Sequence, residues 1–314
     1  MYSKTDIDLL ASKSGFIRDN LEKVLRLCEI LQFITDNPLT AGNLALKGGT
    51  AINLVVFDMP RLSVDIDLDF TKNCSREEML EVRDSINTDI INYMSTQGYN
   101  LSPSTKNPHT LDSWVFYYRN VAGNKDNIKI EINYSMRNHV LPIIVHNVKL
   151  EDIPISVSVR VLSPVELFAS KIKALIERTA PRDIFDVYNM IENNVIQEND
   201  YPLLRKIVLF YLAVGGSKPP SVEYNLNSIE SMNYFQIKRK LIPVLKKGDQ
   251  FNFEKAKVEV KAFIASLMIL NGEEREFVNK FHAKIYDPHL LFENNEILER
   301  IISHPMAIWK CTQK

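Results

Sequence analysis

The stretch that decides the fold is residues 61–70, RLSVDIDLDF. Its apolar and acidic side chains alternate with a period of two, which is typical of a strand with one apolar face and one acidic face. Upstream lie residues 46–54, LKGGTAINL. The glycine pair in this segment predicts a turn that enters a short helix. The chain therefore places a glycine turn directly before an acidic strand.

The two motifs together predict chemistry on phosphates. Asp65 and Asp67 lie at positions i and i+2, so their carboxylates project from the same side of the strand. Two neighbouring anions repel unless a cation lies between them, and oxygen ligands suit Mg²⁺, which completes its shell with phosphate oxygens. A Gly-Gly turn lets backbone N–H groups approach those phosphates closely. An acidic strand alone is most often a solvated face; the order of the two motifs favours metal-assisted nucleotide transfer.

Composition describes an ordinary globular protein. The 314 residues are 45% hydrophobic and 25% charged, enough for one large domain or two packed ones. The net charge of −1 gives no overall basic field that would point to nucleic acid. The three cysteines are far apart, match no zinc spacing and predict free thiols in a reducing cytosol. Since no signal peptide and no uncharged apolar run of about 18 residues occurs, we expect a cytoplasmic protein without a membrane partner.

Apolar periodicity predicts the order of the elements. Helices are expected over residues 5–35 and 76–94, and strands over 114–118, 128–134 and 153–161. From Ser163 onward the pattern is mostly helical, and residues 215–220 read as a loop or sub-domain linker. The predicted fold class is α/β (α+β), a mixed β-sheet core with flanking helices followed by a mostly helical C-terminal region. The predicted domains are residues 1–162 and 163–314.

The second informative stretch is residues 162–178, LSPVELFASKIKALIER. Ser163 as N-cap, Pro164 at the first helical position and Glu166 at the third predict a capping box. On the same helix Lys171 and Arg178 share a face, with a small residue between them, and this face can lie against a triphosphate.

A pair of aspartates follows in residues 180–188, APRDIFDVY. Asp183 and Asp186 are three positions apart and share one helix face, with Asp183 in the first turn, where the helix dipole favours a carboxylate. From the pattern alone, helix capping with ordinary surface ion pairs accounts for both residues.

The motifs resemble those of the AbiEii/AbiGii toxin family, within the polymerase-beta-like nucleotidyltransferases. In that family a Lys-Gly-Gly-Thr-Ala turn precedes Arg-x-Ser-x-Asp-Ile-Asp-Leu. A Glu-x-x-Ala-x-Lys-x-x-Ala-Leu helix then precedes an Arg-Asp-x-x-Asp segment. All four strings occur in this chain, over roughly residues 44–190. Beyond about residue 200 the chain is similar only in being helical.

The resemblance implies roles for individual residues. The implied nucleotide-binding residues are Lys47, Gly48, Gly49, Thr50, Arg61, Ser63, Lys171 and Arg178. The implied catalytic residues are Asp65, Asp67, Lys171, Asp183 and Asp186, of which Asp186 or Asp183 would take a proton from the acceptor hydroxyl. Asp65 and Asp67 would hold Mg²⁺, with Glu131 as a candidate third ligand or, alternatively, an exposed strand residue. Asp69 lies one step beyond the motif and is expected to be solvated or to lie behind the ligands. The helical C-terminal region would complete the active site.

The resemblance also implies a biological setting. Such a toxin belongs to a type IV toxin–antitoxin system, defends bacteria against phage and is neutralised by a separately encoded antitoxin. It would transfer a nucleotide from an NTP to an acceptor, the 3′ end of tRNA by analogy with related toxins. Two alternatives remain open: the same chemistry on a protein or a small molecule, and a nucleotide-binding interaction module without catalysis.

A basic stretch in the C-terminal region bears on the acceptor. Aromatic residues lie near it, so it could hold an RNA backbone and stack a base. The alternative is a set of lysine-rich, solvated helix faces. Its cations are Lys238, Arg239, Lys240, Lys246, Lys247, Lys255, Lys257 and Lys261.

Overall fold

The computed structural model describes residues 2–105, 108, 110–150 and 153–313. The chain forms two compact units. The first comprises Met1–Arg137, Ile143–Leu162 and Val244–Asp249. The second comprises Asn138–Pro142, Ser163–Pro243 and Gln250–Lys314. The first unit therefore includes a short segment, Val244–Asp249, that interrupts the second unit in sequence. The second unit includes Asn138–Pro142, which interrupts the first.

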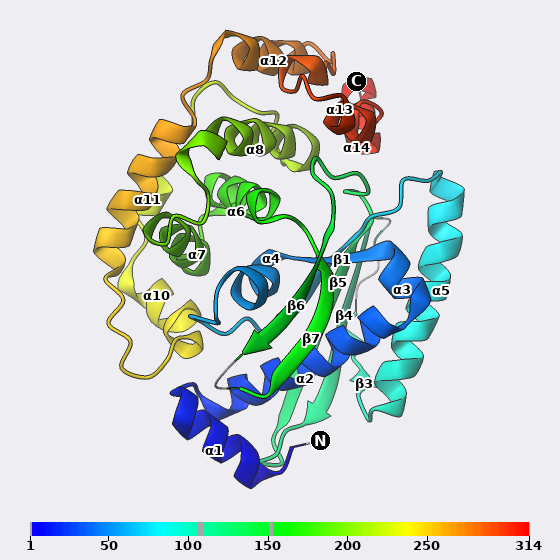
Figure 1. Cartoon of the computed structure of the whole chain (residues 1–314), viewed down its shortest axis with the longest axis vertical. Helices are drawn as coiled ribbons and strands as arrows, with labels where there is room; N and C mark the ends of the chain where they lie inside the picture. Colours follow the sequence, from blue (N-terminus) through cyan, green and yellow to red (C-terminus); the bar gives the residue numbers. More distant parts are fainter. Residues whose placement is uncertain (1, 106–107, 109, 151–152, 314) are drawn as a thin grey trace. The chain divides into compact units, whose positions relative to one another are not determined.

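A seven-stranded mixed sheet, in the order β3-β4-β5-β2-β1-β7-β6, organises the first unit (Figure 1). Strand β2 pairs antiparallel with β1 and parallel with β5, so the acidic strand has a neighbour on each side. The predicted mixed sheet with flanking helices is confirmed. The strands are β1 (Leu44–Lys47), β2 (Asp65–Phe70), β3 (Asn100–Leu101), β4 (Leu111–Arg119), β5 (Lys125–Asn133), β6 (Ile144–Leu150) and β7 (Ile155–Val161).

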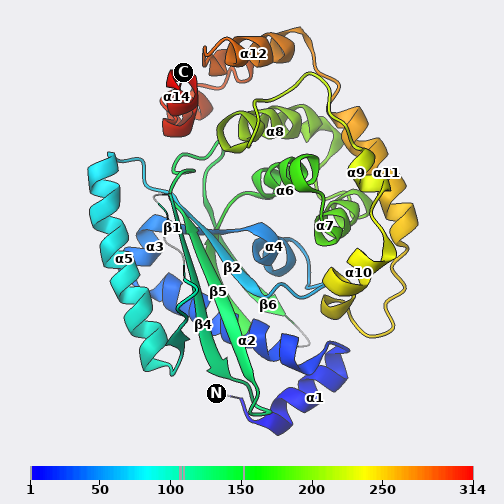
Figure 2. The same ribbon diagram turned by 180° about the vertical axis from the view of Figure 1, so that it is seen from behind.

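Strand alternation gives the sheet one buried apolar face. In β5 the side chains of Ile128, Ile130 and Ile132 are fully buried, whereas Lys129 and Glu131 between them stay half-buried. Helix α2 (Arg18–Asp36) packs along β7 (Figure 1), and α5 (Arg76–Thr96) lies beside β3 and β4 (Figure 2). The acidic side chains of β2 thus share a face with the polar side chains of β5.

The N-terminal segment differs from the prediction of one helix over residues 5–35. It forms α1 (Lys4–Ser14) and α2, because Gly15 ends α1 in the left-handed conformation with φ 78°. Asn37 then caps the short α3 (Pro38–Asn43). The helix predicted over 76–94 and the strands predicted over 114–118, 128–134 and 153–161 correspond to α5, β4, β5 and β7. Strands β1, β3 and β6 were not predicted.

The second unit is helical, as predicted. Helix α6 packs against α7 and α8 (Figure 1). The loop after Gly215 lies inside this unit, so it is not a linker between the two units. No helix in the described part of the chain is long and apolar enough to cross a bilayer. The helices are α6 (Pro164–Arg178), α7 (Pro181–Glu192), α8 (Tyr201–Gly215), α9 (Asn227–Glu230), α10 (Tyr234–Lys240), α11 (Phe253–Leu267), α12 (Gly272–His282), α13 (Asn295–Ile301) and α14 (Pro305–Thr312).

The start of α6 corrects the predicted capping box. The hydroxyl of Ser163 accepts the N–H of Glu166, as expected, but Glu166 does not reach back to the N-cap. Its fully buried carboxylate accepts the backbone N–H groups of Val140 at 2.8 Å and Leu141 at 3.1 Å, and the hydroxyl of Tyr211. Glu166 therefore fastens residues 138–142 to α6, because their N–H groups would otherwise be buried without acceptors.

We expect Glu166→Gln to lower the free energy of unfolding by about 1–3 kcal/mol, because its amide places a donor where N–H and O–H donors converge. Burial raises the pKa of Glu166, but hydrogen bonds from His139, Tyr211 and Val140 outweigh burial and leave the pKa below its ordinary value. The stabilisation by the carboxylate is therefore complete above the unfolded-state pKa and is lost as the pH falls through the lower folded-state pKa.

The wild type and Glu166→Gln are unfolded with denaturant at several pH values from about 7 to about 3. The difference between their unfolding free energies should shrink only below about pH 4.3. A difference in unfolding free energy that stays constant over this range would contradict the role given to the Glu166 carboxylate.

Candidate active site

The glycine turn lies directly against the acidic strand. Strand β1 ends at Lys47, and α4 (Gly48–Ala51) begins at once, with Gly48 at φ 71°. A Cβ atom on Gly48 would lie 2.5 Å from Oδ2 of Asp67, closer than any real contact. Glycine is therefore needed at this position both for its backbone angle and for the approach of Asp67.

The second glycine packs on the segment that leads into β2. A Cβ atom on Gly49 would lie 3.0 Å from a terminal guanidinium nitrogen of Arg61 and 3.1 Å from Oγ of Ser63. Arg61 is 1% exposed, and its guanidinium donates to the carbonyl of Leu62 at 3.0 Å. The structure thus places Arg61 and Ser63, both predicted to bind nucleotide, beside the glycine turn, with Arg61 buried beneath it.

A hydrogen bond joins the turn to the first aspartate. The hydroxyl of Thr50, which is buried, donates to the backbone carbonyl of Asp65. The side-chain amide of Asn53 donates to the carbonyl of Gly49 at 2.8 Å and holds the other end of the turn. The side chain of Thr50 therefore fixes the position of β2 relative to α4.

The carboxylates of Asp65 and Asp67 lie half-buried on one face of β2. Among the described residues, the Asp65 carboxylate has no hydrogen-bond or ion-pair partner. Positions two apart in a strand are separated by roughly 6.6 Å, a spacing that a bound cation and its phosphate ligands can bridge. A carboxylate pair with an oxygen-only donor set next to a glycine turn fits a hard divalent cation.

Glu131 is the nearest candidate for a further acidic ligand. The register of β2 and β5 pairs Asp67 with Glu131 and Asp65 with Lys129. Glu131 forms an ion pair with Lys129 at 2.9 Å. Within the described ranges no group of three or more acidic, histidine or cysteine side chains is arranged around a single metal position. The structure therefore places Glu131 beside Asp67, and its service as a ligand remains a prediction.

Asp69, the third acidic residue of β2, is buried rather than solvated. It is 3% exposed and forms an ion pair with Lys47, the last residue of β1. Lys47, predicted to bind nucleotide, is thus held beside the acidic strand. The sequence pattern could not indicate this pair because it depends on the antiparallel pairing of β1 with β2.

The lysine helix and the second aspartate pair meet in the second unit. Lys171 on α6 is 8% exposed, and its ammonium lies 2.8 Å from Asp183 and 3.1 Å from Asp186 on α7. Both aspartates are at most 2% exposed. The interpretation of Asp183 and Asp186 as surface residues is therefore wrong. Arg178, on the same face as Lys171, is 70% exposed, and its Nε lies 3.5 Å from Asp183.

The structure divides the basic stretch. Lys246 and Lys247 belong to the first unit. On α11, Lys257 is buried and binds the carbonyls of Glu230 and Met232, and Lys261 pairs with Glu230. The cations of α10 are exposed, and no described carboxylate pairs with them. The residues of this α10 surface are Tyr234, Phe235, Lys238, Arg239 and Lys240.

A glycine turn set against Asp67, with Asp65 on the same face of a strand in a mixed sheet, fits metal-assisted chemistry on phosphates, the class of reaction that nucleotidyltransferases perform. A family model described as "Nucleotidyl transferase AbiEii toxin, Type IV TA system" matches residues 29–273, well over half of the chain. The chain belongs to this family of nucleotidyltransferase toxins, and the resemblance inferred from its motifs is confirmed.

One solved structure with a TM-score above 0.5 supports the same fold. MenT4, a nucleotidyltransferase toxin from Mycobacterium tuberculosis, is similar over 90% of this chain and 99% of its own, with a TM-score of 0.59 and 16% identity. JHP933 from Helicobacter pylori is similar over 85% of this chain and 97% of its own, with a TM-score of 0.48 and 15% identity. No curated protein matches the sequence.

The close approach of Gly48 to Asp67 gives a testable result. We expect Gly48→Ala to cost about 1–2 kcal/mol for the positive φ and to displace the Asp67 carboxylate. A displacement of about 1 Å is enough to lower the transfer rate by a factor of about 100. Gly248→Ala is the matched control, because Gly248 has φ 83° and nothing within 4 Å of its Cβ position. If thermal melting and transfer rate change equally in both variants, the contact with Asp67 has no part in activity.

Proposed function

We propose that the chain transfers a nucleotide from an NTP to an RNA acceptor, with Mg²⁺ held by Asp65 and Asp67. The observation that carries this proposal is the glycine turn packed against Asp67, with Asp65 on the same strand face and no described partner on its carboxylate. The bound cation would neutralise phosphate charge and polarise the α-phosphate. Backbone N–H groups at Gly49 and Thr50, in the first turn of α4, would bind the other phosphates.

The reaction is a displacement at the α-phosphate. An acceptor hydroxyl loses its proton and forms a new P–O bond, and the bond to pyrophosphate breaks. Lys47, Arg61 and Ser63 would keep the turn and strand aligned, since each of them lies against the turn or strand β2. Glu131, beside Asp67, is proposed to add acidic charge to the cation site.

Lys171, Arg178, Asp183 and Asp186 form one cluster, the Lys171 cluster, which is proposed to serve the same reaction. Lys171 and Arg178 would contact nucleotide phosphates, and Asp186, or Asp183, would accept the proton of the acceptor hydroxyl. Because Lys171 touches both aspartates, the three side chains would act as one unit. Since Asp186 is our first choice for the base, Asp186→Asn should lose more of the transfer rate than Asp183→Asn when both variants are folded.

The α10 surface favours RNA as the acceptor. Tyr234 is 67% and Phe235 69% exposed, next to three exposed cations. Exposed aromatic rings beside unpaired cations can stack bases and bind phosphates. Helix α10 packs on α7, and Nε of Arg182 donates to the carbonyl of Lys240 at 2.7 Å. The surface is thus attached to the helix that carries Asp183 and Asp186.

The family assignment supports the biological setting. We propose the tRNA 3′ end as the acceptor, a cytoplasmic site of action, a role in defence against phage and neutralisation by a separately encoded antitoxin.

The acceptor is tested by labelling with each NTP in turn. The protein is incubated with Mg²⁺ and either total RNA or total protein from cells. The proposal predicts label on tRNA, and a variant with Tyr234→Ala, Phe235→Ala and Lys238→Gln should lose most of it. Label on protein alone would favour protein nucleotidylation. A folded protein that binds no NTP in the presence of Mg²⁺ would favour a non-catalytic interaction module.

A further inference from the structure

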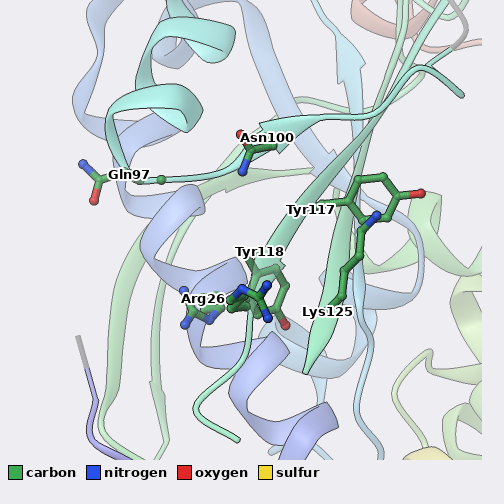
Figure 3. A pocket seen from close by; sticks show the side chains of 8 residues that line it. Arg26, Gln97, Asn100, Tyr117, Tyr118 and Lys125 are labelled. Carbon is green, nitrogen blue, oxygen red and sulfur yellow. The ribbon is translucent and has the colours of Figure 1, made fainter. Parts of the chain in front are cut away.

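A cavity of about 620 Å³ lies in the first unit, at the end of the β4–β5 hairpin (Figure 3). Residues of α2, β3, β4 and β5 line it, and none of them has a role in the proposed transfer reaction. Lys125, one of its lining residues, stands four positions before Lys129, the strand partner of Asp65. The two sites are therefore separated by about 13 Å along β5.

The charged residues that the structure describes at the wall of this cavity are all cations, of which Arg26 is paired with Glu22 behind it. Among the described residues, the lining includes Arg26, Arg119 and Lys125 but no aspartate or glutamate. Arg26 is 9% exposed and fixed in place: its Nε donates to Glu22 at 2.8 Å, and its guanidinium lies 4.4 Å from the ring centroid of Tyr118. Because Glu22 balances the charge of Arg26, the positive charge that this cavity offers an anionic ligand comes from Arg119 and Lys125.

The other two cations are exposed. The ammonium of Lys125 lies 3.8 Å from the ring centroid of Tyr117, and the guanidinium of Arg119 donates to the carbonyl of Gly123 at 3.0 Å. Neither cation pairs with a carboxylate in the part of the chain that the structure describes. Binding an anion here would therefore break no ion pair of Arg119 or Lys125.

We propose that this cavity binds a phosphate-bearing ligand, with Arg119 and Lys125 contacting the phosphate groups. Guanidinium and ammonium groups are the usual phosphate binders in proteins, and the volume falls within the range of small-molecule sites. The side chain of Asn100, which lies between those of Gln97 and Tyr117 in Figure 3, offers an amide for sugar or base hydrogen bonds. The inference does not rest on the proposed transfer reaction.

The test is calorimetric binding to the full chain in EDTA, which removes divalent cations from Asp65 and Asp67. The probes are ATP, inorganic tripolyphosphate and a short RNA oligonucleotide. Arg119→Gln/Lys125→Gln should weaken binding of at least one probe by a factor of about 10 or more. Lys4→Gln/Lys149→Gln removes the same charge from exposed positions elsewhere in the unit and should leave binding unchanged.

Comparing the three probes identifies which kind of phosphate ligand the cavity binds. ATP and tripolyphosphate bound without RNA would indicate a free nucleotide or polyphosphate, and RNA alone would indicate phosphates of a strand. Both outcomes support the proposal if the Arg119/Lys125 variant loses the binding. No binding of any probe to the wild type, or equal losses in both double variants, would overturn it. Repeating the titration in Asp65→Asn should give the same result, so failure of the transfer proposal is distinguished from failure of this one.

Discussion

Asp65→Asn is expected to lower the rate of nucleotide transfer by a factor of about 1000 or more, which corresponds to about 4 kcal/mol of transition-state stabilisation. The asparagine keeps the shape of the side chain but removes the charge that holds the cation. Because no described residue pairs with the Asp65 carboxylate, the substitution removes no internal ion pair, and the melting temperature should change little. Initial rates over a range of Mg²⁺ concentrations measure the effect.

Asp58→Asn is the matched control, since Asp58 is an exposed aspartate of the same unit, before the acidic strand. It should retain the wild-type rate at every Mg²⁺ concentration. An Asp65→Asn protein that keeps more than about a tenth of the wild-type rate would remove Asp65 from the catalytic site.

Lys171→Met is expected to cost about 3–5 kcal/mol of unfolding free energy, because it removes the ammonium that lies against the buried carboxylates of both Asp183 and Asp186. Lys173→Met on the same helix is the control. Lys173 is half-buried, pairs with Glu177 at 2.6 Å and donates to the carbonyl of Gly215 at 2.9 Å, and its loss should cost about 1–2 kcal/mol because it is not the cation between two buried carboxylates. Chemical denaturation of both variants measures the difference.

A third variant separates folding from catalysis at this cluster. Lys171→Met combined with Asp183→Asn and Asp186→Asn removes the stranded charges and should regain much of the lost stability. If it regains stability but not transfer, the cluster serves the reaction. If Lys171→Met loses no more stability than Lys173→Met, the buried ion-pair network does not stabilise the second unit.

Local patterns predicted the elements that carry the candidate site. The period of two placed β2, and the capping residue Ser163 with Pro164 placed the start of α6, since both signals reside in neighbouring residues. The role of Glu166 could not be read in this way. Its partners lie 25 to 45 positions away and depend on a segment of the chain that folds onto the second unit.

Contacts across elements account for the other differences. Lys171 and the aspartates were each predicted to occupy one face of a helix, but only the packing of α6 on α7 makes those faces one buried cluster. The cavity beside Arg26 and Arg119 had no sequence signal, because its lining residues come from distant parts of the chain. The catalytic and ligand roles of the site residues remain predictions, since they concern bound groups.

The most direct measurement compares an NTP labelled on its α-phosphate with the same NTP labelled on its γ-phosphate. Each is incubated with the protein, Mg²⁺ and total RNA, in parallel with Asp65→Asn. Nucleotide transfer predicts α-label on RNA, γ-label in released pyrophosphate, and loss of both products in the variant. γ-Label on the acceptor would mean phosphoryl transfer instead, and α-label on RNA that persists in Asp65→Asn would contradict the proposed site.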